Sequence, residues 1–177
     1  MRHLLWMIFF MLATPAHADS MWQRASSDRF VIYSDQKQDD ILDFARRLER
    51  YHNAMQVRLR LADKKPSPSN RVTVYVLRDE RQIKKLFGDT KSAVAGFYIP
   101  RAGGSVAFVP RVNTSSLAKA NFSEIILLHE YAHHMMYSSS SLAFPLWLSE
   151  GFAEFHATAK FNPDGSVGTR NILGVTT

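Results

Sequence analysis

The sequence is organised around one short motif, His129-Glu130-Tyr131-Ala132-His133, which has the form H-E-x-x-H. In an α-helix, residues four positions apart lie one turn above each other on the same face. A helix at this position would therefore direct the imidazoles of His129 and His133 at a single point, as two ligands of a tetrahedral Zn²⁺ are directed. Glu130 would lie beside that point, where a water bound to the metal would be.

A third candidate ligand follows in the segment Trp147–Glu154, which reads WLSEGFAE and contains Glu150. Two histidines, one carboxylate and one open coordination position are the pattern of a catalytic rather than a structural zinc site. The apolar run Ile125–Leu128 directly before the motif is typical of a buried active-site helix. The alternative interpretation is a surface helix on which the His and Glu residues are incidental.

Residues 1–18 have the pattern of a secretory signal peptide. Arg2 and His3 form a short charged start, and Leu4–Ala13 is an apolar stretch too short to span a bilayer comfortably. Ala16-His17-Ala18 matches an A-x-A cleavage site, so we expect a mature domain of residues 19–177 that is exported to the periplasm or secreted. After cleavage we expect no stable membrane insertion. The alternative is an uncleaved membrane anchor.

The charged residues argue against a nucleic-acid partner. The formal net charge is +6, but the basic residues are dispersed rather than gathered into a stripe with interleaved aromatic residues. The chain has no cysteine, so an exported form has no disulfides, and its stability must come from the core and from any bound metal. A basic surface-binding or nucleic-acid-binding domain is the weakest functional hypothesis.

Hydrophobic periodicity predicts an α+β fold with a small mixed β-sheet and helices, followed by a helical zinc-binding segment. The expected strands are Arg29–Tyr33, Arg71–Leu77, Ala93–Ile99 and Ser105–Val109, the last two forming a glycine-rich hairpin. The expected helices are Gln38–Leu59, a short one from Asp79 through Phe87, one starting near Asn121–Ser123 and ending at Ser138–Ser141, and one from Pro145 to about Ala159. The remaining segments are a polar lead-in (Trp22–Ser27), a turn (Asn162–Gly165) and a strand or irregular tail (Ser166–Leu173).

Two of these elements carry a further expectation. The strand Arg71–Leu77 is apolar on both faces, which favours a central position in the sheet. His52 lies on the apolar face of the first long helix, and we interpret it as a packed core histidine rather than a ligand.

The segment Glu124–Phe155 resembles the gluzincin metallopeptidases, whose zinc ligands follow the pattern H-E-x-x-H…E. Within it, Trp147–Ala153 is similar to the W-L-N-E-G-F-A signature of the aminopeptidase N branch. The resemblance implies a zincin-like fold and an exported bacterial enzyme that hydrolyses peptide bonds with a zinc-activated water. It implies Zn²⁺ as the cofactor, a peptide or protein as the substrate, His129, His133 and Glu150 as the metal ligands, and Glu130 as the general base. By the same analogy, the strand Ser105–Pro110 would pair with an extended peptide.

Two positions near the motif complete the predicted site. Glu154 follows Glu150 by one helical turn, so it could accept the outer N–H of a ligand imidazole and fix its orientation. A solvated surface carboxylate is the alternative for Glu154. His134 lies about 100° around the helix from His133, so we expect it outside the site.

The sequence departs from the aminopeptidase branch in two ways. The region before the motif helix reads Gly103–Phe108 and lacks the acid of the G-x-M-E-N motif, so the resemblance extends to gluzincins in general rather than to aminopeptidases. The family's Tyr or His that stabilises the oxyanion has no counterpart after Phe161, so either this group lies in the N-terminal half or the chain is a fragment. A non-enzymatic, zinc-containing binding or scaffold module of the same fold is the main alternative function.

Overall fold

The computed structural model of this chain describes residues 22–62, 64–101, 103–111, 122–140 and 142–169. The predicted signal peptide of residues 1–18 and its cleavage site lie outside these ranges. No helix within them is long and apolar enough to cross a membrane.

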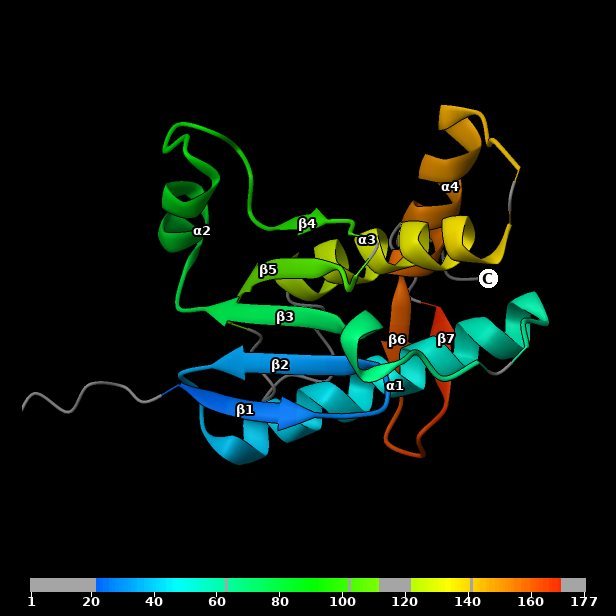
Figure 1. Cartoon of the computed structure of the whole chain (residues 1–177), viewed down its shortest axis with the longest axis horizontal. Helices are drawn as coiled ribbons and strands as arrows, with labels where there is room; N and C mark the ends of the chain where they lie inside the picture. The colour runs from blue at the N-terminus through cyan, green and yellow to red at the C-terminus, as the bar shows by residue number, and fades with distance from the viewer. Residues whose placement is uncertain (1–21, 63, 102, 112–121, 141, 170–177) are drawn as a thin grey trace, which may run out of the picture.

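The chain has a mixed α+β fold built on a five-stranded sheet (Figure 1). The strands lie in the order β1-β2-β3-β5-β4, with parallel pairing of β2 with β3 and of β3 with β5, and antiparallel pairing at both outer positions. The bounds are β1 Gln23–Ser26, β2 Phe30–Ser34, β3 Val72–Leu77, β4 Phe97–Ile99 and β5 Val106–Pro110. The prediction that Arg71–Leu77 forms a central strand is confirmed by β3.

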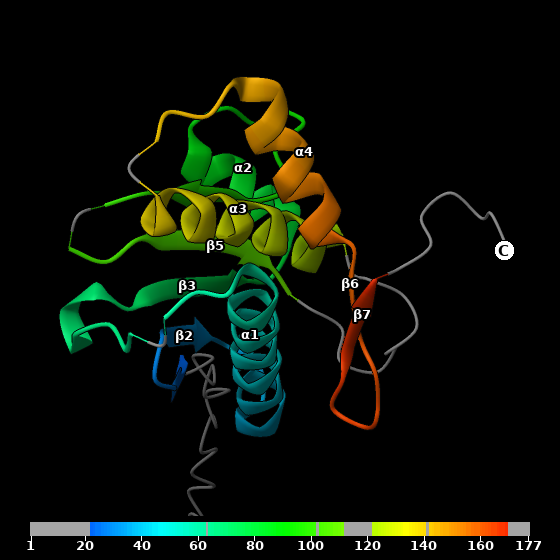
Figure 2. The same ribbon diagram turned by 90° about the vertical axis from the view of Figure 1, so that its right-hand side faces the viewer.

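Two long helices cover the inner face of the sheet. Helix α1 (Gln38–Leu59) packs on β1 and β2, and α3 (Phe122–Ser139) packs on β5 and β4, as Figure 2 shows from the side. Ile32, Val74 and Ala107 occupy one row across β2, β3 and β5, and all are 1% exposed or less. Their burial under the helices contributes to the hydrophobic stabilisation of the fold, because apolar surface removed from water contributes about 25 cal/mol per Å².

The outer face of the sheet carries a row of aromatic rings. Tyr33, Tyr75, Phe108 and Phe97 are in register on β2, β3, β5 and β4, and their ring centroids are 5.3, 5.2 and 4.8 Å apart. Cross-strand aromatic pairs of this kind stabilise a sheet and fix its register. Helix α2 (Glu80–Phe87) adjoins one end of the row, where the Phe87 ring lies 5.5 Å from that of Phe97.

The segment after the sheet is helical and ends in a small hairpin. Helix α4 (Leu146–Ala157) packs against α3, and β6 (Ala159–Phe161) pairs with β7 (Val167–Thr169). The predicted turn at Asn162–Gly165 is confirmed, with the Gly165 N–H donating to the Asn162 carbonyl at 3.1 Å.

Three local predictions were wrong. The predicted polar lead-in contains β1, whose buried Ala25 is its single inward apolar residue, so the alternating pattern was too weak to recognise. The strand predicted at Ala93–Ile99 is reduced to Phe97–Ile99. The last helix ends at Ala157, because Ala159 already pairs with Thr169 in a strand.

The predicted pairing of Ser105–Pro110 with an extended peptide requires a free strand edge, which β5 lacks where β4 pairs with it. β5 is paired on both sides, in parallel with β3 and in antiparallel with β4. A hairpin can turn either of its strands toward the sheet, and the sequence of the hairpin does not say which. The outer position next to the helical segment therefore belongs to β4.

Candidate metal site

The H-E-x-x-H motif lies in the middle of α3, as predicted. Leu127, Leu128 and Ala132 on the same helix are 1% exposed or less, and they fix the helix against the sheet and α1. Helix α3 is oriented about its axis so that these residues are buried, and in this orientation His129 and His133 are half-buried on the side facing α4. Helix α4 follows a short connection and brings Glu150 to the same place.

The two histidines and Glu150 converge on one point. The Nε2 atoms of His129 and His133 are 3.2 Å apart. The carboxylate oxygens of Glu150 lie 3.4 Å from each of them, Oε2 from His129 and Oε1 from His133. Ligand atoms bound tetrahedrally at 2.0–2.1 Å from Zn²⁺ are about 3.3 Å apart. His129, His133 and Glu150 could therefore hold a metal ion, and imidazole nitrogens and carboxylate oxygens are donors that zinc sites use.

Glu154 lies on the outer side of His129. Its Oε1 is 3.6 Å from Nδ1 of His129, the ring nitrogen that faces away from the convergence point. The Glu154 side chain is 72% exposed, so solvent competes for this contact. The outer nitrogen of His133 is buried and has no hydrogen-bond partner among the described residues.

A cavity of about 580 Å³ opens over this cluster. Its walls include Tyr98 and Pro100, the two metal-site histidines, Glu130, His134 and Glu150. Glu130 is half-buried and lines the same cavity as the candidate metal ligands. The predicted general base is therefore brought together with the three predicted ligands.

His134 and Tyr98 are among the residues of this cavity that were not anticipated from the sequence. His134 was placed outside the site by its helical angle, yet it forms part of the wall, because the cavity is wide enough to cover a second face of α3. Burial lowers the pKa of His134, so its imidazole stays neutral near pH 7. Tyr98 on β4 had no recognisable signal, since its position depends on which hairpin strand is outermost.

Tyr98 contributes its ring rather than its hydroxyl to the wall. The hydroxyl is buried and has no hydrogen bond of good geometry within the described residues. Burial raises the pKa of Tyr98 to about 12, against a smaller lowering effect of the Ser105 hydroxyl. The phenol is therefore protonated at neutral pH.

Polar contacts between α1 and α3 hold the motif helix in place. The Tyr51 hydroxyl donates to the Leu128 carbonyl at 3.1 Å, and Nδ1 of His52 lies 2.8 Å from the hydroxyl of Tyr131. Tyr131 is inside the H-E-x-x-H motif, so this contact fixes the rotation of the helix at the metal site. The interpretation of His52 as a packed core histidine is confirmed by its 8% exposure.

Comparison of the sequence with known proteins finds no matching family model and no matching curated relative.

Proposed function

We propose that the chain is an exported zinc metallopeptidase of the gluzincin type. The observation that carries this proposal is the convergence of His129, His133 and Glu150 at spacings of 3.2 to 3.4 Å. Glu130 lines the same cavity, which gives the cluster the open side that catalysis needs. Export rests on the signal-like sequence of residues 1–18.

In this proposal each residue of the site has a separate role. Zn²⁺ held by the three residues would supply Lewis acidity, which lowers the pKa of a water molecule to about 7 and polarises a carbonyl group. Glu130 accepts a proton from the attacking water and passes it to the departing amine. Glu154, whose Oε1 lies 3.6 Å from Nδ1 of His129, helps to orient that imidazole.

The substrate binds along β4 in this proposal. β4 is the outer strand of the sheet, and Tyr98 at its centre forms a wall of the cavity over the metal ligands. An extended peptide can add to the free edge of such a strand through backbone hydrogen bonds. In this proposal the strand that pairs with the extended peptide is Phe97–Ile99 rather than Ser105–Pro110, which was expected from the sequence.

The first test combines metal content with activity. The purified protein should bind about one zinc ion per chain and cleave a peptide pool, and Glu130→Gln should keep the zinc but lose activity on the order of 10²–10⁴-fold. Glu80→Gln, which changes an exposed acid on α2, is the matched control and should retain activity.

Two results would overturn parts of the proposal. A Glu130→Gln variant that cleaves as fast as the parent would remove Glu130 as the base. Zinc bound at full occupancy with no cleavage of any peptide pool would instead support the zinc-containing binding or scaffold module.

A further inference from the structure

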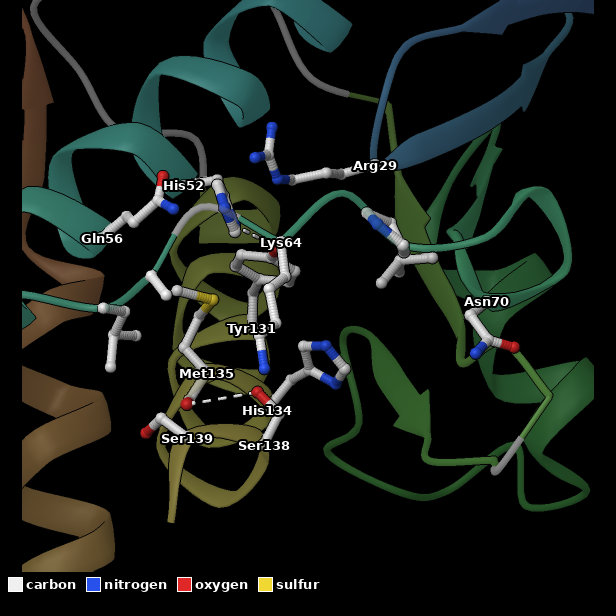
Figure 3. A pocket seen from close by; sticks show the side chains of 14 residues that line it. Arg29, His52, Gln56, Lys64, Asn70, Tyr131, His134, Met135, Ser138 and Ser139 are labelled. Carbon is white, nitrogen blue, oxygen red and sulfur yellow. Dashed lines mark hydrogen bonds between the residues drawn. The ribbon is translucent and has the colours of Figure 1, made fainter.

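A second cavity, of about 390 Å³, adjoins the metal site on another side of α3. It lies between α3, the C-terminal half of α1 and the loop that leads into β3 (Figure 3). Its walls carry hydrogen-bonding side chains from all three elements, among them Gln56 on α1, Lys64 and Asn70 on the loop, and Ser138 on α3. We call this space the loop cavity.

Two cationic side chains are found among the described residues of the cavity wall. The described residues that line it include Arg29 and Lys64 and no Asp or Glu. Arg29 is 6% exposed and its NH1 is held 3.1 Å from Oε2 of Glu49, which balances its charge. Lys64 is exposed and is the second cationic residue of the cavity wall.

The loop cavity and the metal cavity share part of one wall. His134 and Ser138, one turn apart on α3, line both spaces. Figure 3 shows the Lys64 side chain extending over α3 toward the turn that carries these two residues. His134 directly follows the candidate ligand His133, and an extended peptide advances about 3.3–3.6 Å per residue. A bound peptide can therefore reach the loop cavity within a few residues of the metal.

We propose that the loop cavity binds a carboxylate group of the substrate, with Lys64 as its charged partner and Gln56 and Asn70 as neutral hydrogen-bond donors. The carboxylate is either the α-carboxylate at the end of a peptide or the side chain of an Asp or Glu. This inference deepens the proposed peptidase function and rests on it for the statement that the ligand is a peptide.

A kinetic test measures the preference for charge. The parent should cleave a peptide that presents a carboxylate to this cavity about tenfold better, in kcat/KM, than its amide counterpart. Lys64→Ala should remove most of that preference, and Lys64→Glu should reverse it. Lys65→Ala is the matched control, because Lys65 is the next residue, pairs with Asp28 at 2.8 Å and does not line the cavity.

A binding test separates this inference from the proposed function, since it needs no cleavage. The side-chain amide NMR signals of Gln56 and Asn70 are followed with three probes: N-acetyl-glutamine, N-acetyl-glutamate α-amide and N-acetyl-glutamine amide. The first carries only an α-carboxylate, the second only a side-chain carboxylate, and the third carries neither.

The outcomes are distinct. Shifts caused by a charged probe, absent with the neutral one and lost in Lys64→Glu, support the inference and identify the source of the carboxylate. Equal shifts with all three probes, or none with any, overturn it even in an active peptidase. A protein that binds the charged probe but cleaves nothing retains the carboxylate pocket and loses the proposed function.

Discussion

Gly104 is the residue of the β4–β5 connection at which a side chain is hardest to accommodate. Its φ is +100°, and a Cβ placed there would lie 2.5 Å from the Ser69 carbonyl oxygen and 3.0 Å from that of Arg71. Both obstacles are backbone atoms, which cannot rotate away as a side chain can. Gly104→Ala should therefore lower the free energy of unfolding by about 2 kcal/mol or more.

The neighbouring glycine provides the control for this prediction. A Cβ on Gly103 would have no atom within 4 Å, so Gly103→Ala should change the stability by less than about 0.5 kcal/mol. Urea denaturation of both variants measures the difference. Equal stabilities would show that the loop relaxes around the added methyl group.

At the scale of single residues, the sequence predicted what depends on local geometry. The convergence of His129 and His133 follows from helical spacing alone, and the Glu150 prediction needed only that a second helix should return to the first. Tyr98 and His134 were missed because their contribution depends on strand order and on cavity width. Neither quantity is encoded in the few residues around them.

At the scale of the elements, one carboxylate joins the ends of three parallel strands. Asp35 follows β2, and its oxygens lie 3.2 Å from NH2 of Arg78 after β3 and 2.7 Å from NH2 of Arg111 after β5. The Asp35 side chain is 8% exposed. Burial would raise the pKa of Asp35, but hydrogen bonds from Arg111 and Arg78 outweigh it, so the pKa lies below its ordinary value.

Asp35→Asn should therefore destabilise the protein at neutral pH, by about 1–3 kcal/mol. Because the folded-state pKa is lowered, the contribution of Asp35 is present above its unfolded value of about 3.9 and is lost as the pH falls further. The cost of the substitution should accordingly shrink below about pH 4. Thermal unfolding of parent and variant between neutral and acidic pH measures this.

The exposed pair of Asp43 and Arg46 on α1 provides the comparison. Asp43→Asn should cost less than about 0.5 kcal/mol, because water screens exposed ion pairs. A cost for Asp35→Asn that is just as small, or that grows in acid, would contradict a stabilising role for Asp35.

The order of the long elements along the chain was easier to predict than the short strands and the exact ends of the elements. The helix α1 was found from apolar periodicity, whereas α3 and the central strand β3 were found from continuous apolar runs, and such signals are strong in long or fully buried elements. β1 and β4 have only 4 and 3 residues. In such short strands the pattern gives little information, and pairing with a neighbour decides the outcome.

At the scale of the whole molecule, the candidate metal ligands link helix α3 to helix α4. His129 and His133 come from α3, and Glu150 comes from α4, where it is 48% exposed. An unfolded chain does not hold these three groups together, so metal binding should stabilise the native state through linkage. Zinc at a hundredfold excess over its Kd adds about 2.7 kcal/mol, which corresponds to a rise in Tm of roughly 5–10 °C.

Variants of the site should lose different parts of this zinc-dependent stabilisation, and the loss should be larger for a residue that contacts the metal directly. Glu150→Gln should lose most of the zinc-dependent rise in Tm, because it removes a charged ligand. Glu154→Gln should lose a smaller part, because it acts through the orientation of His129 alone. Calorimetry with zinc and with chelator tests both variants. If zinc raises the Tm of Glu150→Gln as much as that of the parent, Glu150 is not a ligand of the ion and α4 does not contribute to the metal site.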